Sequence, residues 1–125
     1  MNEFGKYLRE IRASRRPSIS QEALGNAVGR SKMTICQFEQ GKTAPPRGEL
    51  LDAIIDALEA TKDEEQELRF LAASQRGSVP DDIYEYFFST SLIYSVIKAA
   101  KEAGADEASW AELLSNMEDG NAAAE

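Results

Sequence analysis

The chain has 125 residues, 42% of them apolar and 29% charged, with a formal net charge of −8, which fits one compact domain or a small domain with an appendage. No apolar run approaches the roughly 20 residues that cross a bilayer, and the N-terminus lacks the apolar core of a signal peptide, so we expect a cytoplasmic protein without a membrane anchor. The absence of histidine and the single cysteine, Cys36, exclude histidine-based catalytic triads, ordinary zinc sites and internal disulfides.

Charge is divided unevenly along the chain. Residues 1–47 hold nine basic and four acidic side chains, a net charge of +5, whereas the remainder holds five basic and eighteen acidic ones, a net charge of −13. Such asymmetry suggests a polyanion-binding end joined to a part that stays off the polyanion. The alternative is an uneven scatter of solvated charges.

Two helices are predicted at the start of the basic part. Phe4, Leu8 and Ile11 lie at helical spacing within residues 2–15, and the segment "RRPS" then ends the helix because proline disfavours helical geometry before it. Ser20 can cap a second, short helix. Its inner face would carry Ala23, Leu24, Ala27 and Val28.

A sharp turn and a third helix are expected next. Gly25 removes a side chain where the two helices cross, and Gly29 permits the turn. Ser31 can cap the third helix, and Gly41 can close it. Ile35 and Phe38 would face inward, which leaves an exposed face of Ser31, Lys32, Met33, Cys36 and Gln37. The pattern is helix, tight turn, helix.

The segment "SQEALGNAVGRSKMTICQFEQGKTAPP" resembles the helix-turn-helix of phage lambda repressor and Cro-type transcription regulators, the xenobiotic response element family. The matching residues are Gln21, Gly25, Gly29, Ile35, Phe38 and the "EQGK" ending. The resemblance covers about residues 4–73 and implies a five-helix DNA-binding domain. It implies a phosphate contact for Gln21 and an ion pair between Arg12 and Glu39. Its base readers would be Ser31, Lys32, Met33 and Gln37.

The chemistry of these side chains suits those roles independently of the resemblance. Lys32 can donate to guanine, Gln37 can pair with adenine, and Met33 can contact a thymine methyl group. Gln21 lies at a helix start, where free N–H groups favour a phosphate. Four residues on flanking loops suit the DNA backbone: Arg30, Lys42, Thr43 and Arg47.

Plainer interpretations of the same residues remain open. Lys32 and Gln37 can be solubilising side chains on an exposed helix. Cys36 can be a redox sensor at the DNA surface or a small, inert filler.

Two further helices complete the predicted DNA-binding domain at residues 1–75. "PPRGELLDAIIDALEA" would bury Leu50, Leu51, Ile54, Ile55 and Leu58, and "DEEQELRFLAAS" would bury Leu68 and Leu71. Residues 76–79 are predicted to be a hinge, because glycine and proline punctuate "QRGSVP".

Residues 80–117 are predicted to form three short helices, which makes the chain all-α. A Ser91 cap and helical spacing favour helix over a β-hairpin across Tyr84–Ile97. The tail at 118–125 is expected to be disordered.

The C-terminal helices are too apolar to stay in water and too short to form a core alone. We therefore expect them to pair with a second copy, although packing onto the N-terminal domain is the alternative. The predicted dimerisation residues are Ile83, Phe87, Leu92, Ile93, Val96, Ile97, Trp110, Leu113 and Leu114.

Together these features predict a homodimeric, sequence-specific repressor that reads a palindromic operator in double-stranded DNA with the helix starting at Ser31. The resemblance also implies a regulatory protease or a partner protein, because some regulators that resemble this arrangement are released from DNA by a dedicated protease or by a partner protein that binds the C-terminal part. The competing hypothesis is a helix-turn-helix antitoxin or another interaction module. We expect no enzymatic activity and no cofactor or metal, since phosphate-loop glycines are missing and the paired Asp81 and Asp82 suit a helix start.

Overall fold

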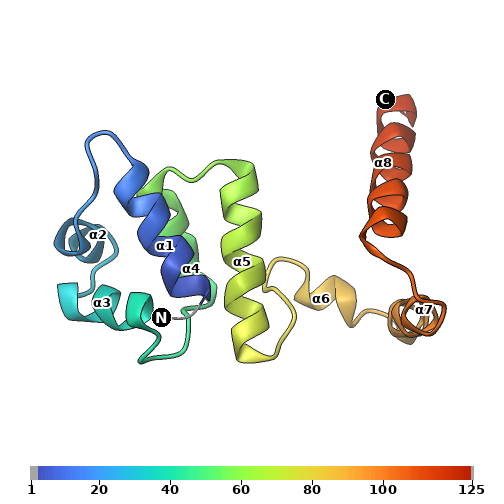
Figure 1. The fold of residues 1–125 in the computed structure, drawn as a ribbon, viewed down its shortest axis with the longest axis horizontal. Helices are drawn as coiled ribbons and strands as arrows, with labels where there is room; N and C mark the ends of the chain where they lie inside the picture. Colours follow the sequence, from blue (N-terminus) through green and yellow to red (C-terminus); the bar gives the residue numbers. More distant parts are fainter. Residues whose placement is uncertain (1–2, 125) are drawn as a thin grey trace. The chain divides into compact units, whose positions relative to one another are not determined.

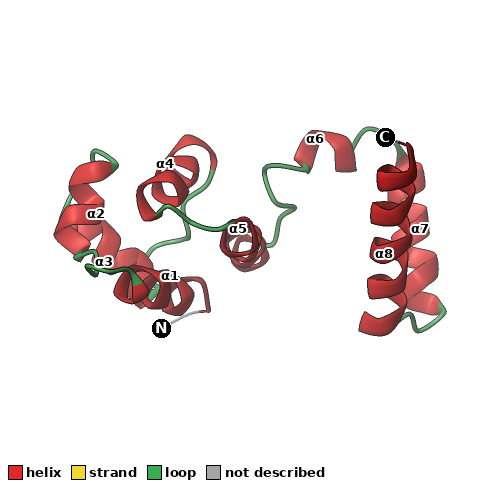
Figure 2. Ribbon diagram, turned by 90° about the horizontal axis from the view of Figure 1, so that it is seen from above, coloured by secondary structure: helices red, strands yellow, loops and turns green. Residues whose placement is uncertain are grey.

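The computed structural model describes residues 3–124, and side-chain burial within residues 3–120. Figure 2 shows helices joined by loops throughout this range, so the predicted all-α class is confirmed. The helices are α1 (Glu3–Ser14), α2 (Gln21–Ala27), α3 (Lys32–Gln40), α4 (Gly48–Leu58), α5 (Lys62–Arg76), α6 (Tyr84–Phe87), α7 (Ser91–Glu102) and α8 (Glu107–Ala124). None of the helices between residues 3 and 124 combines the length and apolarity that spanning a membrane needs.

The chain divides into two compact units between Glu85 and Tyr86. This division lies beyond the predicted hinge at 76–79. The reason is that the chain after α5 turns back onto its own unit, where Asp81 accepts a hydrogen bond from Gly48 N at 2.7 Å. Residues up to Glu85 therefore belong with the first five helices.

One hydrophobic core unites α1 to α5, and Figure 1 shows these five helices grouped together. Phe4, Leu8, Leu24 and Ile35 are fully buried in it. Burying one such side chain contributes roughly 1.5–3 kcal/mol. The rest of the core consists of Ile11, Val28, Phe38, Leu51, Ile54, Ile55, Leu58, Leu68 and Ala72.

The predicted inner face of α2 is wrong at two positions. Ala23 and Ala27 are exposed, while Leu24, Gly25 and Val28 are buried. A helix of two turns packs only a narrow stripe against its neighbours. Alanine side chains are small enough to lie in the core or in water, so their apolar character does not determine which side of α2 faces the core.

The helix caps predicted at Ser20, Ser31 and Gly41 are present in the first unit. The hydroxyl groups of Ser20 and Ser31 each accept a hydrogen bond from the backbone N–H three residues later. Gly41 ends α3 in the left-handed conformation, with φ of 73°. Thr61 and Glu64 form a capping box at the start of α5.

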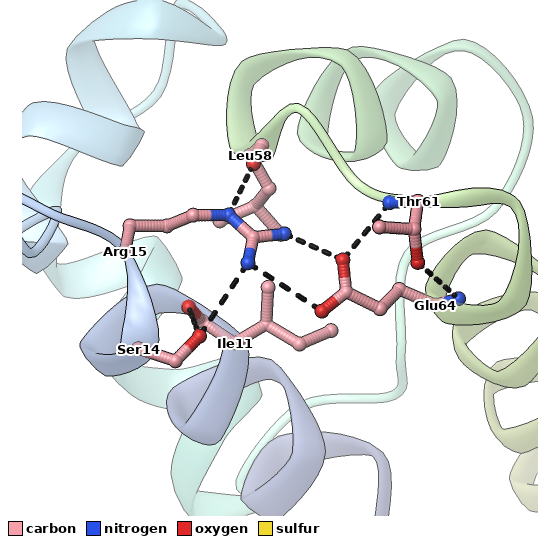
Figure 3. Close-up of polar contacts among 6 residues, drawn as sticks. All are labelled: Ile11, Ser14, Arg15, Leu58, Thr61 and Glu64. Carbon is pink, nitrogen blue, oxygen red and sulfur yellow. Dashed lines mark hydrogen bonds and ion pairs between the residues drawn. The ribbon is translucent and has the colours of Figure 1, made fainter.

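Arg15 joins the ends of three helices (Figure 3). From the end of α1, its Nε donates to Leu58 O at 2.7 Å, at the C-terminus of α4. Its Nη2 donates to Glu64 Oε1 at 2.6 Å, in the first turn of α5, and the same carboxylate accepts from Thr61 N. These hydrogen bonds, the one from Arg15 first, lower the pKa of Glu64 below the usual value.

The helices α6 and α7 cover most of Tyr84–Ile97 and confirm the preference for helix over hairpin there. Thr90 caps α7 in place of the predicted Ser91, since its hydroxyl accepts from Leu92 N at 3.3 Å. Residues of α7 and α8, among them Val96 and Trp110, line a hollow of about 230 Å³.

The disordered tail predicted at 118–125 does not agree with the backbone of α8, which continues to Ala124. Three consecutive alanines precede the last residue, and alanine has the highest helix propensity of all residues. Glu125 lies outside the described residues.

Candidate nucleic-acid interface

The turn between α2 and α3 is packed directly against α2 (Figure 1). Arg30 N donates to Gly25 O at 2.8 Å. A Cβ atom on Gly25 would lie 2.9 Å from the carbonyl oxygens of Arg30 and Ser31, which is too close for any other residue. Gly29 provides the turn with φ of 70°. The two glycines thus fix the angle at which α3 leaves α2.

The same packing decides which face of α3 meets water. Ile35 is fully buried and Phe38 nearly so, and both face the core. Lys32 is exposed, and Met33 is 62% exposed on the opposite face. Met33 is therefore a large apolar side chain that stays exposed to water, because Ile35 and Phe38 anchor the opposite face of α3 in the core.

The remaining predicted base readers divide into two environments. Ser31 is exposed, but its hydroxyl is engaged as the α3 cap and lies 3.1 Å from Thr34 Oγ1. Gln37 and Cys36 are half-buried. The four predicted readers therefore lie in α3 or directly before it, where Ser31, Lys32 and Met33 are exposed and Gln37 is half-buried.

A buried carboxylate connects three of the helices around this face. Glu39 is 2% exposed and accepts hydrogen bonds from Arg12 Nε at 2.8 Å and Arg12 Nη2 at 2.9 Å. Arg12 Nη1 also donates to Ile19 O at 2.9 Å, in the loop before α2. The ion pair that the resemblance implies is present.

Gln21 has a partner that sequence reasoning missed. Its Nε2 donates to Glu39 Oε1 at 3.1 Å, so the side chain is held at the start of α2 by the same carboxylate. An amide nitrogen carries two hydrogens, and this bond leaves one for a phosphate oxygen. The network orients the group that we predicted to contact DNA.

Four predicted backbone contacts lie on the loops around α3. Arg30, Lys42, Thr43 and Arg47 are all exposed. Within residues 3–124, none of the three basic ones forms an ion pair with a carboxylate, whereas Arg12 and Arg15 both do. Part of the positive charge counted in residues 1–47 is therefore neutralised internally, whereas the basic side chains on the loops around α3 keep their charge available.

Gly5 is a second residue that sequence reasoning missed. It is buried in α1, where a Cβ atom would clash with the backbone of Glu39 and Phe38 at the end of α3. The available signal was a glycine within a helical pattern, which costs about 1 kcal/mol and usually has a packing reason. Here the reason is the close approach of α1 to α3.

Comparison with known proteins places this geometry in a class. A family described as a helix-turn-helix domain matches residues 3–68, and the chain belongs to this family. Its class is that of DNA-binding transcriptional regulators.

A curated relative in Bacillus subtilis (strain 168), the "Uncharacterized HTH-type transcriptional regulator RghRB", is 29% identical over 106 residues. The match covers 85% of this chain and 72% of the relative. No solved structure matches significantly. The predicted helix-turn-helix regulator is confirmed, whereas the lambda repressor and Cro subtype stays a prediction.

Proposed function

We propose that the protein is a homodimeric, sequence-specific repressor that reads a two-fold symmetric operator with α3. The observation that carries this proposal is the anchoring of α3 by Ile35 and Phe38, which leaves Lys32 and Met33 exposed between unpaired basic loops. An α-helix presented in this way fits the major groove, where each base pair offers a distinct pattern of donors and acceptors.

In this proposal the side chains divide between reading and positioning. Lys32 donates to guanine, Gln37 pairs with adenine, Met33 contacts a thymine methyl group, and Ser31 lies at the edge of the groove. The phosphate contacts come from Gln21, Arg30, Lys42, Thr43 and Arg47. The second group contributes affinity that falls with salt, and the first contributes sequence preference.

The second unit, in this proposal, pairs two copies. A single helix-turn-helix reads too few base pairs to select one site in a genome, whereas a two-fold pair reads half-sites about one DNA turn apart. Leu92, Val96 and Leu114 are all more than half exposed. A second copy would cover them, and the acidic character of this region would keep it off the DNA.

The test compares binding to DNA from the region upstream of the protein's own gene with binding to random duplex, across a salt series. A Lys32→Ala, Gln37→Ala variant should lose the preference for the specific site and retain salt-dependent binding to random duplex. The matched control is Lys62→Ala, Gln66→Ala, which removes the same two residue types from exposed positions on α5. Equal behaviour of the two variants would refute the assignment of readers.

A second candidate function is supported by the exposed apolar surface of the second unit. Tyr86 is 76% exposed and Leu92 69%, and such surface fits a partner protein as well as a second copy. The protein would then be an antitoxin or another interaction module. Co-purification with the product of a neighbouring gene, together with equally weak binding to specific and random DNA, would favour this function over the repressor.

A further inference from the structure

Arg47 lies at the junction between the loop after α3 and the start of α4. It is the N-cap residue of α4, with extended backbone angles of φ −143° and ψ 172°, and its side chain makes no capping hydrogen bond. Its guanidinium is therefore free of α4. A long side chain on a loop has many orientations, so its use as a phosphate contact depends on how its backbone is held.

Both peptide groups next to Arg47 are held by one pair of side chains. Arg76 Nη1 donates to Pro46 O at 2.9 Å, which fixes the peptide group before Arg47. Gly48 N donates to Asp81 Oδ2 at 2.7 Å, which fixes the peptide group after it. Because peptide groups are planar, the two planes flanking a residue define its φ and ψ. The direction of the Arg47 Cα–Cβ bond is set accordingly.

The pair that does this is itself well supported. Arg76 Nη2 lies 3.5 Å from Asp81 Oδ1, and the Arg76 side chain is 12% exposed at the end of α5. Gly77 ends α5 with φ of 67° and lets the chain turn back, so that Asp81 reaches the N-terminus of α4. A carboxylate is favourable there because the free N–H groups carry positive partial charge. Pro46, whose carbonyl is held, is buried.

We propose that Arg76 and Asp81 are positioning residues that aim Arg47 at the DNA backbone. This inference rests on the proposed binding of DNA through α3 and its flanking loops. A backbone that is already ordered loses less conformational entropy when the contact forms, which strengthens binding. Asp81 therefore promotes DNA binding although its own charge repels phosphate.

The sign of that effect provides the test. Removing an acid from a DNA-binding unit should, by electrostatics alone, leave binding unchanged or strengthen it. If Asp81 aims Arg47, its removal weakens binding. Asp82→Ala is the matched control, because Asp82 is the exposed neighbouring acid and the charge change is identical.

We would measure binding of the full chain to a labelled duplex of random sequence across a salt series, because backbone contacts are independent of sequence. Asp81→Ala should weaken binding about three- to tenfold and reduce the salt slope by about one, as Arg47→Ala should. In an Arg47→Ala background, Asp81→Ala should have no further effect, because both changes remove the same contact. Arg76→Lys should bind better than Arg76→Ala.

Other outcomes would overturn either the positioning role or the proposed function. Equal affinities of Asp81→Ala and Asp82→Ala would overturn the positioning role and leave the proposed function intact. Additive losses in the Arg47→Ala, Asp81→Ala variant would also overturn it, since Asp81 would then act elsewhere. Circular dichroism establishes that each variant is folded, and Asp81→Leu, which has a similar shape and no acceptor for Gly48 N, takes the place of an unfolded Asp81→Ala in the same cycle. Failure of the unaltered chain to bind the duplex at low salt would refute the proposed function itself.

Discussion

At the scale of single residues, the Glu39 carboxylate is a buried charge that depends on its hydrogen-bond partners for compensation. It is almost fully buried, and Arg12 neutralises it through two hydrogen bonds. Arg12→Ala would leave this charge buried and uncompensated, so we expect a loss of about 3 kcal/mol in the free energy of unfolding. Urea denaturation would measure the loss.

The control for that prediction is Arg9→Ala. Arg9 is an exposed base on the same helix, and its removal should change stability by less than about 0.5 kcal/mol. An Arg12→Met, Glu39→Leu variant removes both charges and should recover much of the loss. Similar stabilities of Arg12→Ala and Arg9→Ala would contradict the view that the pair holds α1 on α3.

At the scale of helices, Arg15 and Glu64 connect α1, α4 and α5 (Figure 3). Arg15 lowers the pKa of Glu64 in the folded protein. A carboxyl group with a lowered folded pKa stabilises the fold above its usual pKa, and this contribution is lost as the pH falls from there through the lowered value. Glu64→Gln should therefore reduce stability at neutral pH, by about 1 kcal/mol, and the difference should shrink in acid.

Urea denaturation at several pH values below neutrality would show that convergence. Glu67→Gln, an exposed acid one turn along α5 without a hydrogen bond to Arg15, is the control. If the loss of stability in Glu64→Gln instead stays constant down to strongly acidic pH, the charge of the Glu64 carboxylate does not account for the stabilising interaction with Arg15.

The same helices show what the sequence can and cannot predict. Serine caps, closing glycines and apolar spacing predict α1 to α5 because these signals are local. Glu64, the partner of Arg15, lies 49 residues further along the chain, and no spacing rule predicts that these two residues meet. The family resemblance predicted the ion pair between Arg12 and Glu39. Only the structure showed that Gln21 also donates a hydrogen bond to Glu39.

At the scale of the whole molecule, the second unit carries most of the large apolar side chains that are exposed within residues 3–120. No residue of α7 is buried, although the helix carries leucine, isoleucine and valine. Leu92→Glu, Val96→Glu places two charges on this apolar surface. If two copies pair there, the variant should be monomeric in sedimentation equilibrium at concentrations where the unaltered chain is a dimer.

A matched variant separates apolar contact from charge. Lys98→Gln, Lys101→Gln changes the net charge by the same two units on exposed positions of α7 and should remain dimeric. The monomeric variant should retain weak binding to one half-site and lose the added affinity of the two-site operator, because only linked copies engage both half-sites at once. If it instead binds the operator as tightly as the dimer does, pairing through this surface is not how the protein selects its site.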